Sequence, residues 1–244
     1  MSKNNIFLVC AGFALWFAAI SCGLFNTTPV NDLRSETQSV DLGTANTAKV
    51  RIEFAAGSLK VDGGADRLME ADFRYNVDDW KPRVNYNVSG SRGELVVDHL
   101  RDNLKLPLGK EVVNEWNIHL NNAVPLDLEI RTGAGDSNLD LSALDASNLQ
   151  VEVGAGTTNL DLRGNWDHDV SADITGGVGN LSITLPSDVG VRVNMNTALV
   201  SVTANGLIIE EGGYVNKAFG SAAHTLALTL HAGVGSVVLT ESQQ

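Results

Sequence analysis

The sequence predicts an all-β fold in which short β-units repeat along the chain and stack on one another. Three observations support this prediction. The 244 residues include 24 glycines but only 5 prolines, and aromatic residues make up 6% of the chain. Many segments alternate apolar and polar residues with the period of two that is typical of strands. Two segments, residues 128–141 and residues 149–162, are near copies of each other.

The start of the chain resembles a bacterial export signal that ends at a lipid attachment site. Lys3 gives a basic beginning, and residues 6–20 form an apolar run of the length expected of a signal peptide. The sequence Ala-Ile-Ser then precedes Cys22, and this pattern resembles the bacterial lipobox. The resemblance implies that residues 1–21 are a cleaved signal peptide and that Cys22 carries a diacylglyceryl group.

The alternative is a single N-terminal transmembrane anchor. Extended to Phe25, the apolar run has about 20 residues, which is roughly the length that spans a bilayer. Both interpretations place the rest of the chain outside the cytoplasm, and the first anchors it by lipid to a bacterial membrane. The two cysteines are Cys10 and Cys22. A mature lipoprotein would therefore have no free thiol, and we expect no disulfide scaffold.

The rest of the chain divides by composition into three parts. Residues 22–48 are polar, rich in Asn, Thr and Ser, and not periodic, so we interpret them as a tether. Residues 49–125 contain several alternating segments and are predicted to form an N-terminal β module. Its strands are expected at residues 50–54, 59–61, 84–88, 95–100 and 116–120. Residues 126–244 are predicted to form the repeat stack.

The repeats align with a period of 21 residues, which places Asn138 on Asn159 and then on Asn180. Each of these asparagines is followed by a leucine. Related segments are found at residues 50–61, 191–206 and 226–239. Each copy is predicted to be a strand, a Gly-rich turn and a second strand. One such unit cannot bury its apolar face alone, so the copies are expected to stack as repeat proteins do.

Stacking is expected to bury the alternating apolar residues of both strands in each unit. The expected core residues are Leu128, Ile130, Leu139, Leu141, Leu149, Val151, Val153, Leu160, Leu162, Ile174, Leu181 and Ile183. The intervening charged residues, such as Glu129 and Asp161, are expected to face outward. The glycines are placed where the chain must reverse sharply, because glycine tolerates positive φ.

The Gly-Ala-Gly segments can be compared with three known glycine-containing binding motifs. A dinucleotide fingerprint needs a third glycine and a following helix, and a P-loop needs Gly-Lys-Ser/Thr; neither pattern is present. A calcium-binding β-roll needs nonapeptide repeats with Asp ligands, whereas this period is longer and Thr157 replaces Asp136 in the next copy. The sequence therefore favours a turn over a ligand site.

Several strings of residues resemble one known family. They are W-x-I-x-L at residues 116–120, V-P-L-x-L at residues 124–128, and G-A-G-x-x-x-L-x-L in both near copies. From about residue 49 onward the chain resembles the toast-rack family of bacterial envelope proteins. It is similar, more distantly, to the C-terminal domain of cell-wall-active antibiotic-response proteins and to adhesin-like proteins. The resemblance implies a single-stranded, right-handed, β-helix-like rack that is tethered to a membrane and has no catalytic residues.

The composition and motifs also argue against several functions. The net charge of −12 disfavours nucleic-acid binding, which rewards basic surfaces. Neither a G-x-S-x-G elbow nor an H-E-x-x-H motif is present. The Trp-Asp-His-Asp segment at residues 166–169 could ligate a metal, but a solvated turn is the simpler interpretation. We therefore expect no enzyme activity, no cofactor and no metal.

The expected function is that of a non-catalytic, membrane-tethered cell-envelope protein that presents a β-repeat surface, as an adhesin-like or envelope-stress-related protein would. Its expected partners are the membrane, other envelope proteins, a second copy of itself or a cell-wall polymer. The alternative is a glycan-binding module in which Trp80, Trp116 or Trp166 stacks on sugars. This alternative requires exposed indole rings. A polysaccharide lyase is ranked last, because it needs acidic and basic residues clustered in one groove.

Overall fold

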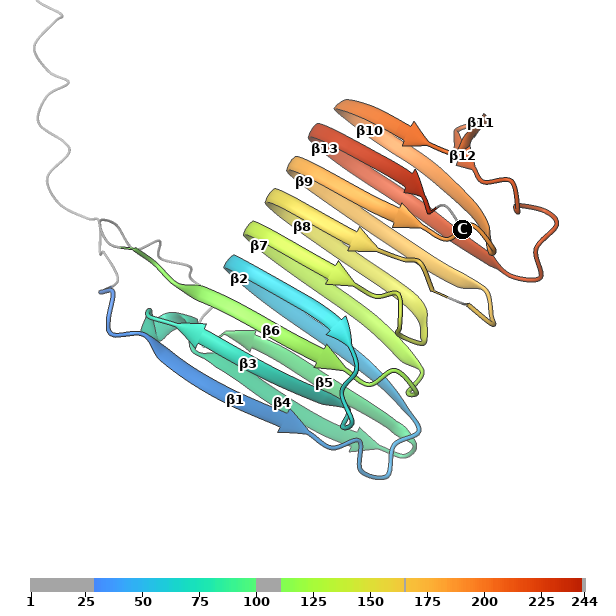
Figure 1. Cartoon of the computed structure of the whole chain (residues 1–244). Helices are drawn as coiled ribbons and strands as arrows, with labels where there is room; N and C mark the ends of the chain where they lie inside the picture. Colours follow the sequence, from blue (N-terminus) through green and yellow to red (C-terminus); the bar gives the residue numbers. More distant parts are fainter. Residues whose placement is uncertain (1–28, 100–110, 165, 243–244) are drawn as a thin grey trace, which may run out of the picture.

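The computed structural model describes residues 29–99, 111–164 and 166–242 (Figure 1). Thirteen strands form one continuous sheet with both parallel and antiparallel pairs, which confirms the predicted all-β fold. The elements are β1 (Arg34–Val40), β2 (Thr47–Gly63), β3 (Met69–Tyr75), the 3₁₀ turn η1 (Asp78–Trp80), β4 (Pro82–Ser89), β5 (Arg92–His99), β6 (Asn114–Leu120), β7 (Leu126–Asp140), β8 (Ala146–Asp161), β9 (Val170–Leu185), β10 (Gly190–Asn205), β11 (Ile208–Glu210), β12 (Gly213–Val215) and β13 (Thr225–Glu241). In the described part of the chain, no helix is long and apolar enough to cross a membrane.

Six long strands form the rack. They lie side by side in the order β2, β7, β8, β9, β13 and β10, and each pairs in parallel with its neighbours (Figure 1). Each strand bends at its centre, which contains glycine in every strand except β10, into a first arm and a second arm, named in chain order. The prediction of two strands joined by a turn in each unit is therefore wrong, because each unit is one continuous bent strand. The chain stays extended through the bend because both arms pair with the same neighbouring strands.

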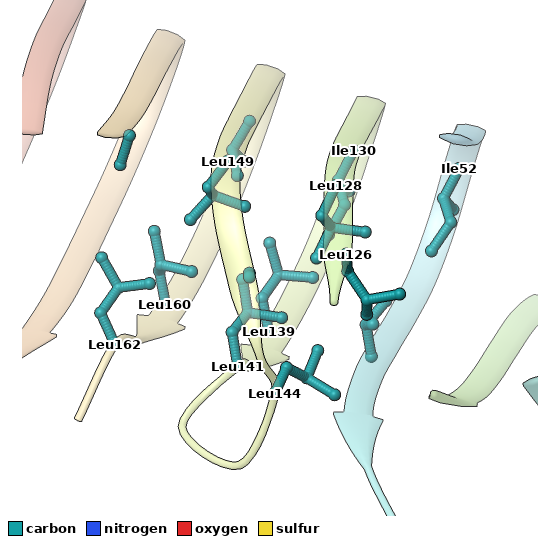
Figure 2. Close-up of a cluster of buried hydrophobic side chains, with 14 of the residues drawn as sticks. Ile52, Leu126, Leu128, Ile130, Leu139, Leu141, Leu144, Leu149, Leu160 and Leu162 are labelled. Atoms are coloured by element: carbon teal, nitrogen blue, oxygen red, sulfur yellow. The ribbon is translucent and has the colours of Figure 1, made fainter. Parts of the chain in front are cut away.

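The core of the rack lies between the two layers that the arms form. Leu128 and Ile130 of the first arm of β7 face the same interior as Leu139 and Leu141 of the second arm (Figure 2). Each fully buried leucine contributes roughly 1.5–3 kcal/mol. All of the expected core residues are buried except Val153, which is half-buried. Alternation along each strand was therefore sufficient to predict the core.

The predicted register of the repeats is only partly correct. Asn138 pairs with Asn159, which confirms the period of 21 residues between β7 and β8. In the next step Asn159 pairs with Ser182, so the offset is 23 residues and Asn180 lies beside Thr157 instead. The pairing of the bend glycines sets this register. The two additional residues fall in the longer connection between β8 and β9.

The last strand of the chain does not lie at the end of the rack. β13 inserts between β9 and β10 and pairs in parallel with both along both arms. β10 is therefore the outermost long strand, although it precedes β13 in the sequence (Figure 1).

The N-terminal part continues both layers of the rack. The first arm of β2 pairs with β5, which pairs with β4, and the second arm pairs with β6, followed by β3 and β1. On its other side β2 pairs with β7 from Ala48 to Val61. The proposed modules, residues 49–125 and residues 126–244, thus share one uninterrupted sheet.

The proposed tether at residues 22–48 also needs correction. β1 lies within this range and pairs along its length with β3. A polar segment can form an edge strand because only one of its faces is covered, and composition alone does not show this. Any tether must therefore end before Asn31, whose N–H donates a hydrogen bond to the Asn76 carbonyl at 2.7 Å. Cys22 and the proposed signal peptide lie outside the described residues.

The bend glycines allow neighbouring strands to approach closely. Gly156 has a φ of +132°, and a Cβ atom added to it would overlap the carbonyl oxygen of Gly135 on the adjacent strand. A Cβ atom added to Gly135 would likewise overlap the carbonyl oxygen of Gly57 on β2. The neighbouring backbone occupies the space where a side chain would begin. The structure thus assigns Gly-Ala-Gly an architectural role.

Candidate interaction surface

The described residues contain no group of three or more His, Cys, Asp or Glu side chains that could hold a metal ion. In the Trp-Asp-His-Asp segment, His168 Nδ1 lies 2.9 Å from Asp167 Oδ1, and its Nε2 lies 3.8 Å from Asp145 Oδ1. The hydrogen bond to Asp167 and the charge of Asp145 raise the pKa of His168. Asp169 instead accepts a hydrogen bond from the Thr225 N–H at 2.8 Å. The acidic residues of this segment thus serve local hydrogen bonds and ion pairs.

The three proposed tryptophan platforms are buried. Trp80, Trp116 and Trp166 are 4%, 1% and 5% exposed, respectively. Trp116 packs edge-on against Phe73 at a centroid distance of 5.3 Å, and Trp166 Nε1 donates a hydrogen bond to the carbonyl of Leu162 at 3.1 Å. A sugar ring cannot stack on a buried indole. The hypothesis of glycan binding through these three residues is therefore wrong.

His99 is half-buried at the edge of the core of the N-terminal part. Its ring packs against Trp116 at a centroid distance of 4.6 Å, and its Nε2 accepts a hydrogen bond from the Ala55 N–H at 2.7 Å. Burial lowers the pKa of His99 to about 4, although the Trp80 backbone and Asp98 act in the opposite direction. The ring is therefore neutral at physiological pH. It acts as a half-buried acceptor that holds β2 where the strand begins its bend.

The outer face of the first arms carries a network of paired charges centred on Glu129. Glu129 faces outward as predicted but is only 6% exposed, because basic side chains cover it. Its carboxylate lies 3.2 Å from Arg51, 3.4 Å from Lys49 and 2.9 Å from Arg131. Burial favours a raised pKa for Glu129, but the hydrogen bond from Arg51 and the charges of Arg51 and Arg131 outweigh it and lower the pKa. This face is thus an internally neutralised network.

The outer face of the second arms is different in character. On β8, β9, β13 and β10 its outward positions form three rows across the strands, set by the observed register. We call this surface the hydroxyl–amide face. Its residues are Thr157, Asn159, Asp161, Asn180, Ser182, Thr184, Ser236, Val238, Thr240, Ser201, Thr203 and Asn205. Apart from Asp161 and Val238, every one is Ser, Thr or Asn.

The hydroxyl–amide face is a regular array of hydrogen-bonding groups. Neighbouring strands are about 4.8 Å apart, and alternate residues along a strand are about 6.6 Å apart. Within the array, Ser236 Oγ donates a hydrogen bond to Asn180 Oδ1 at 2.7 Å, while the one charged member, Asp161, is paired with Arg163. The face therefore offers donors and acceptors with little free charge. Such an array suits contact with another extended surface better than enclosure of a small molecule.

Sequence reasoning missed this surface because it depends on register across strands. The available signal was the lack of charge, apart from Asp161, at alternate positions in residues 157–161, 180–184, 201–205 and 236–240. In each segment taken alone this looks like an ordinary polar strand face. Only the observed pairing combines the four segments into one neutral surface.

The fold and this surface define a class of β-rack proteins in which parallel bent strands form two layers. The chain belongs to the toast-rack family: the N-terminal domain of toast-rack, DUF2154, matches residues 29–184. The family resemblance stated from the sequence is thereby confirmed.

The chain is similar to solved structures to different degrees. A "putative cell adhesion protein" from Clostridium sporogenes is 30% identical, with a TM-score of 0.83, over 86% of this chain and 100% of its own. A "putative adhesin" from Bacteroides fragilis is 12% identical, with a TM-score of 0.35, over 86% of this chain and 98% of its own. The comparison with curated proteins gave no match.

Proposed function

We propose that this chain is a non-catalytic, membrane-tethered cell-envelope protein that uses the hydroxyl–amide face for adhesion. The observation that carries the proposal is the neutrality of this face in a chain with a net charge of −12. The similarity to a "putative cell adhesion protein" that is 30% identical supports the same function. The proposed binding partner is an envelope protein or a cell-wall polymer.

Neutral hydrogen-bonding groups suit weak adhesion that is repeated over an area. A single hydrogen bond contributes only about 0.5–1.5 kcal/mol net, but a regular array can make several at once. Neutral groups avoid the large desolvation cost of buried charges. Many tethered copies on one surface add their contributions through effective concentration. The face can thus support strong attachment between surfaces without a deep binding pocket.

Two isosteric changes test the role of the face. Asn159→Asp together with Asn180→Asp adds two negative charges to the hydroxyl–amide face and leaves its shape unchanged. We expect binding of the full chain to fall about tenfold, since about 1.4 kcal/mol of hydrogen bonding is exchanged for uncompensated desolvation. The measurement is the fraction of detergent-purified chain that sediments with isolated cell walls and with intact cells that lack the chain.

A matched control changes the charge elsewhere. Asn85→Asp together with Asn87→Asp makes the same change at two exposed positions of β4, in the layer formed by the first arms. This variant should bind like the wild type. Equal binding by both variants, or no binding of the wild type to either target, would contradict adhesion through the hydroxyl–amide face.

The tether is tested by the intact mass of the protein extracted from membranes. For the wild type we expect the mass of a chain cleaved before Cys22 with acyl groups added. Cys22→Ala should abolish both cleavage and lipid attachment, because the cysteine thiol is the acceptor. An uncleaved, unmodified mass for both proteins would instead indicate a transmembrane anchor.

A further inference from the structure

The rack ends at β10, and the second arm of β10 has an open edge. β12 covers only Arg192–Asn194 of this strand, and Met195 N–H donates one further hydrogen bond to the Gly212 carbonyl at 3.2 Å. Along residues 199–205, the only strand among the described residues that pairs with β10 is β13, on its other side. We call residues 199–205 the open edge.

The open edge lacks the features that normally protect sheet edges. Residues 193–209, which contain it, include no charged residue and no proline. The edge strands at the N-terminal end of the sheet are different. β1 has Arg34 and Glu36, and β4 begins with Pro82 and then Arg83, which forms two hydrogen bonds with Asp98 at 2.7 and 2.9 Å. Charges and proline discourage an incoming strand, and the open edge has neither.

The interior of the rack is also incompletely covered at this end. Val202 and Ala204 of β10 face the interior and are half-buried, whereas their partners on β13, Val237 and Leu239, are 2% and 0% exposed. The difference arises because no further second arm follows β10. At the bend, Leu199 is 77% exposed. Terminal repeats of stacked proteins usually carry a polar cap, and this arm has none.

We propose that a second copy of this chain pairs with the open edge, antiparallel and related by a twofold axis near Val202. This pairing places Ser201 of one copy opposite Thr203 of the other on the outer face, and Val200 opposite Ala204 on the inner face. Each second-arm sheet then continues into that of its partner. The partner is additional to the one that the hydroxyl–amide face binds, so this inference does not depend on the proposed adhesive function.

Several observations favour a second copy over an unrelated strand. An antiparallel twofold contact uses the same patch on both molecules, and the open edge offers identical small and apolar residues to itself. The two copies each carry a net charge of −12, and a neutral contact avoids placing like charges together. The charged N-terminal strands lie at the opposite end of the rack, so end-to-end pairing keeps them far apart (Figure 1). The rack end also supplies a matching apolar interior, which a lone peptide strand would not.

The number of chains per particle tests the proposal. The full chain, purified in mild detergent, is measured by light scattering with the contribution of the detergent subtracted. We expect two chains per particle for the wild type. Ser201→Glu with Thr203→Glu places four carboxylates opposite one another and should give one chain per particle. Ser201→Lys with Thr203→Glu places opposite charges across the axis and should restore two.

A matched control carries the same two acidic residues away from the edge. Asn180→Glu with Ser182→Glu has the same spacing on β9, inside the rack, and should retain two chains per particle. Unfolding curves that match the wild type show that each variant is folded. A wild type with one chain per particle overturns the proposal. So does a Ser201→Glu, Thr203→Glu variant that is as dimeric as the wild type, because the contact then lies elsewhere.

Discussion

Replacing Gly156 by alanine is expected to lower the free energy of unfolding by about 4 kcal/mol. The new Cβ atom would overlap the carbonyl oxygen of Gly135, and the φ of +132° is strained for any residue with a side chain. Relief would require β7 and β8 to separate at the bend. Since β8 also pairs with β9, the separation would break hydrogen bonds on more than one strand.

The adjacent residue provides the control. Ala155 is exposed at the tip of the same bend and pairs with Val178 on β9, so the rack already contains a larger side chain at the equivalent position. Ala155→Val should change the free energy of unfolding by less than about 0.5 kcal/mol. Urea unfolding of the full chain, followed by tryptophan fluorescence, measures both variants. Equal stability of Gly156→Ala and the wild type would show that the strands do not need this close approach.

Acidification from about pH 6.5 to pH 4 is expected to cost up to about 3 kcal/mol of stability through His99. The pKa of His99 is lowered to about 4 in the folded protein, whereas an unfolded histidine titrates near 6.5. The unfolded chain therefore binds one more proton in this window. The stability that neutral His99 contributes is fully present above about pH 6.5 and is lost as the pH falls. It changes no further below about pH 4.

The pH dependence can be assigned to His99 by substitution. His99→Gln removes the titration, and its side-chain oxygen can still accept the hydrogen bond from the Ala55 N–H. The free energy of unfolding of the His99→Gln variant should change less between pH 6.5 and pH 4 than that of the wild type. His168 has a raised pKa, so its stabilisation is lost as the pH rises. Because both proteins retain His168, the difference between their unfolding profiles isolates His99.

His231→Gln is the control for this pH experiment. His231 lies on the outer face of the first arm of β13, so this variant measures the effect of the same substitution away from the ring contacts of His99. If His99→Gln and the wild type lost stability in parallel, another group would be responsible.

Local pattern predicted the composition of the core but not the arrangement of the strands. Leu139 and Leu160 could be assigned to the interior because alternation along one strand does not require knowledge of its neighbour. Register and order are nonlocal. The repeated Asn-Leu pair favoured Asn180 as the equivalent of Asn159, whereas pairing at the bend places Ser182 there. No periodicity in the sequence indicates that β13 would lie between β9 and β10.

The difference between local pattern and nonlocal strand arrangement also explains why the candidate site residues were predicted only in part. Trp80 was a reasonable platform beside two aspartates, but its exposure depends on how η1, which connects β3 to β4, packs against the rest of the protein, and the sequence does not reveal this. Glu129 follows the outward alternation, yet three basic side chains from β2 and β7 cover it. The hydroxyl–amide face exists only once four distant segments are aligned. In each case the missing information was the identity of the neighbouring strand.

The position of β13 has a consequence for how the protein is made. Synthesis proceeds from the N-terminus, so β10 is complete at Asn205 well before β13 begins at Thr225. Until then β9 and β10 cannot take their final places, because the strand that separates them has not been made. A chain terminated early would keep β2, β7, β8 and β9 but would leave the second arm of β10 without its neighbour. The rack therefore becomes complete only after residues 225–241 have been synthesised and can insert between β9 and β10.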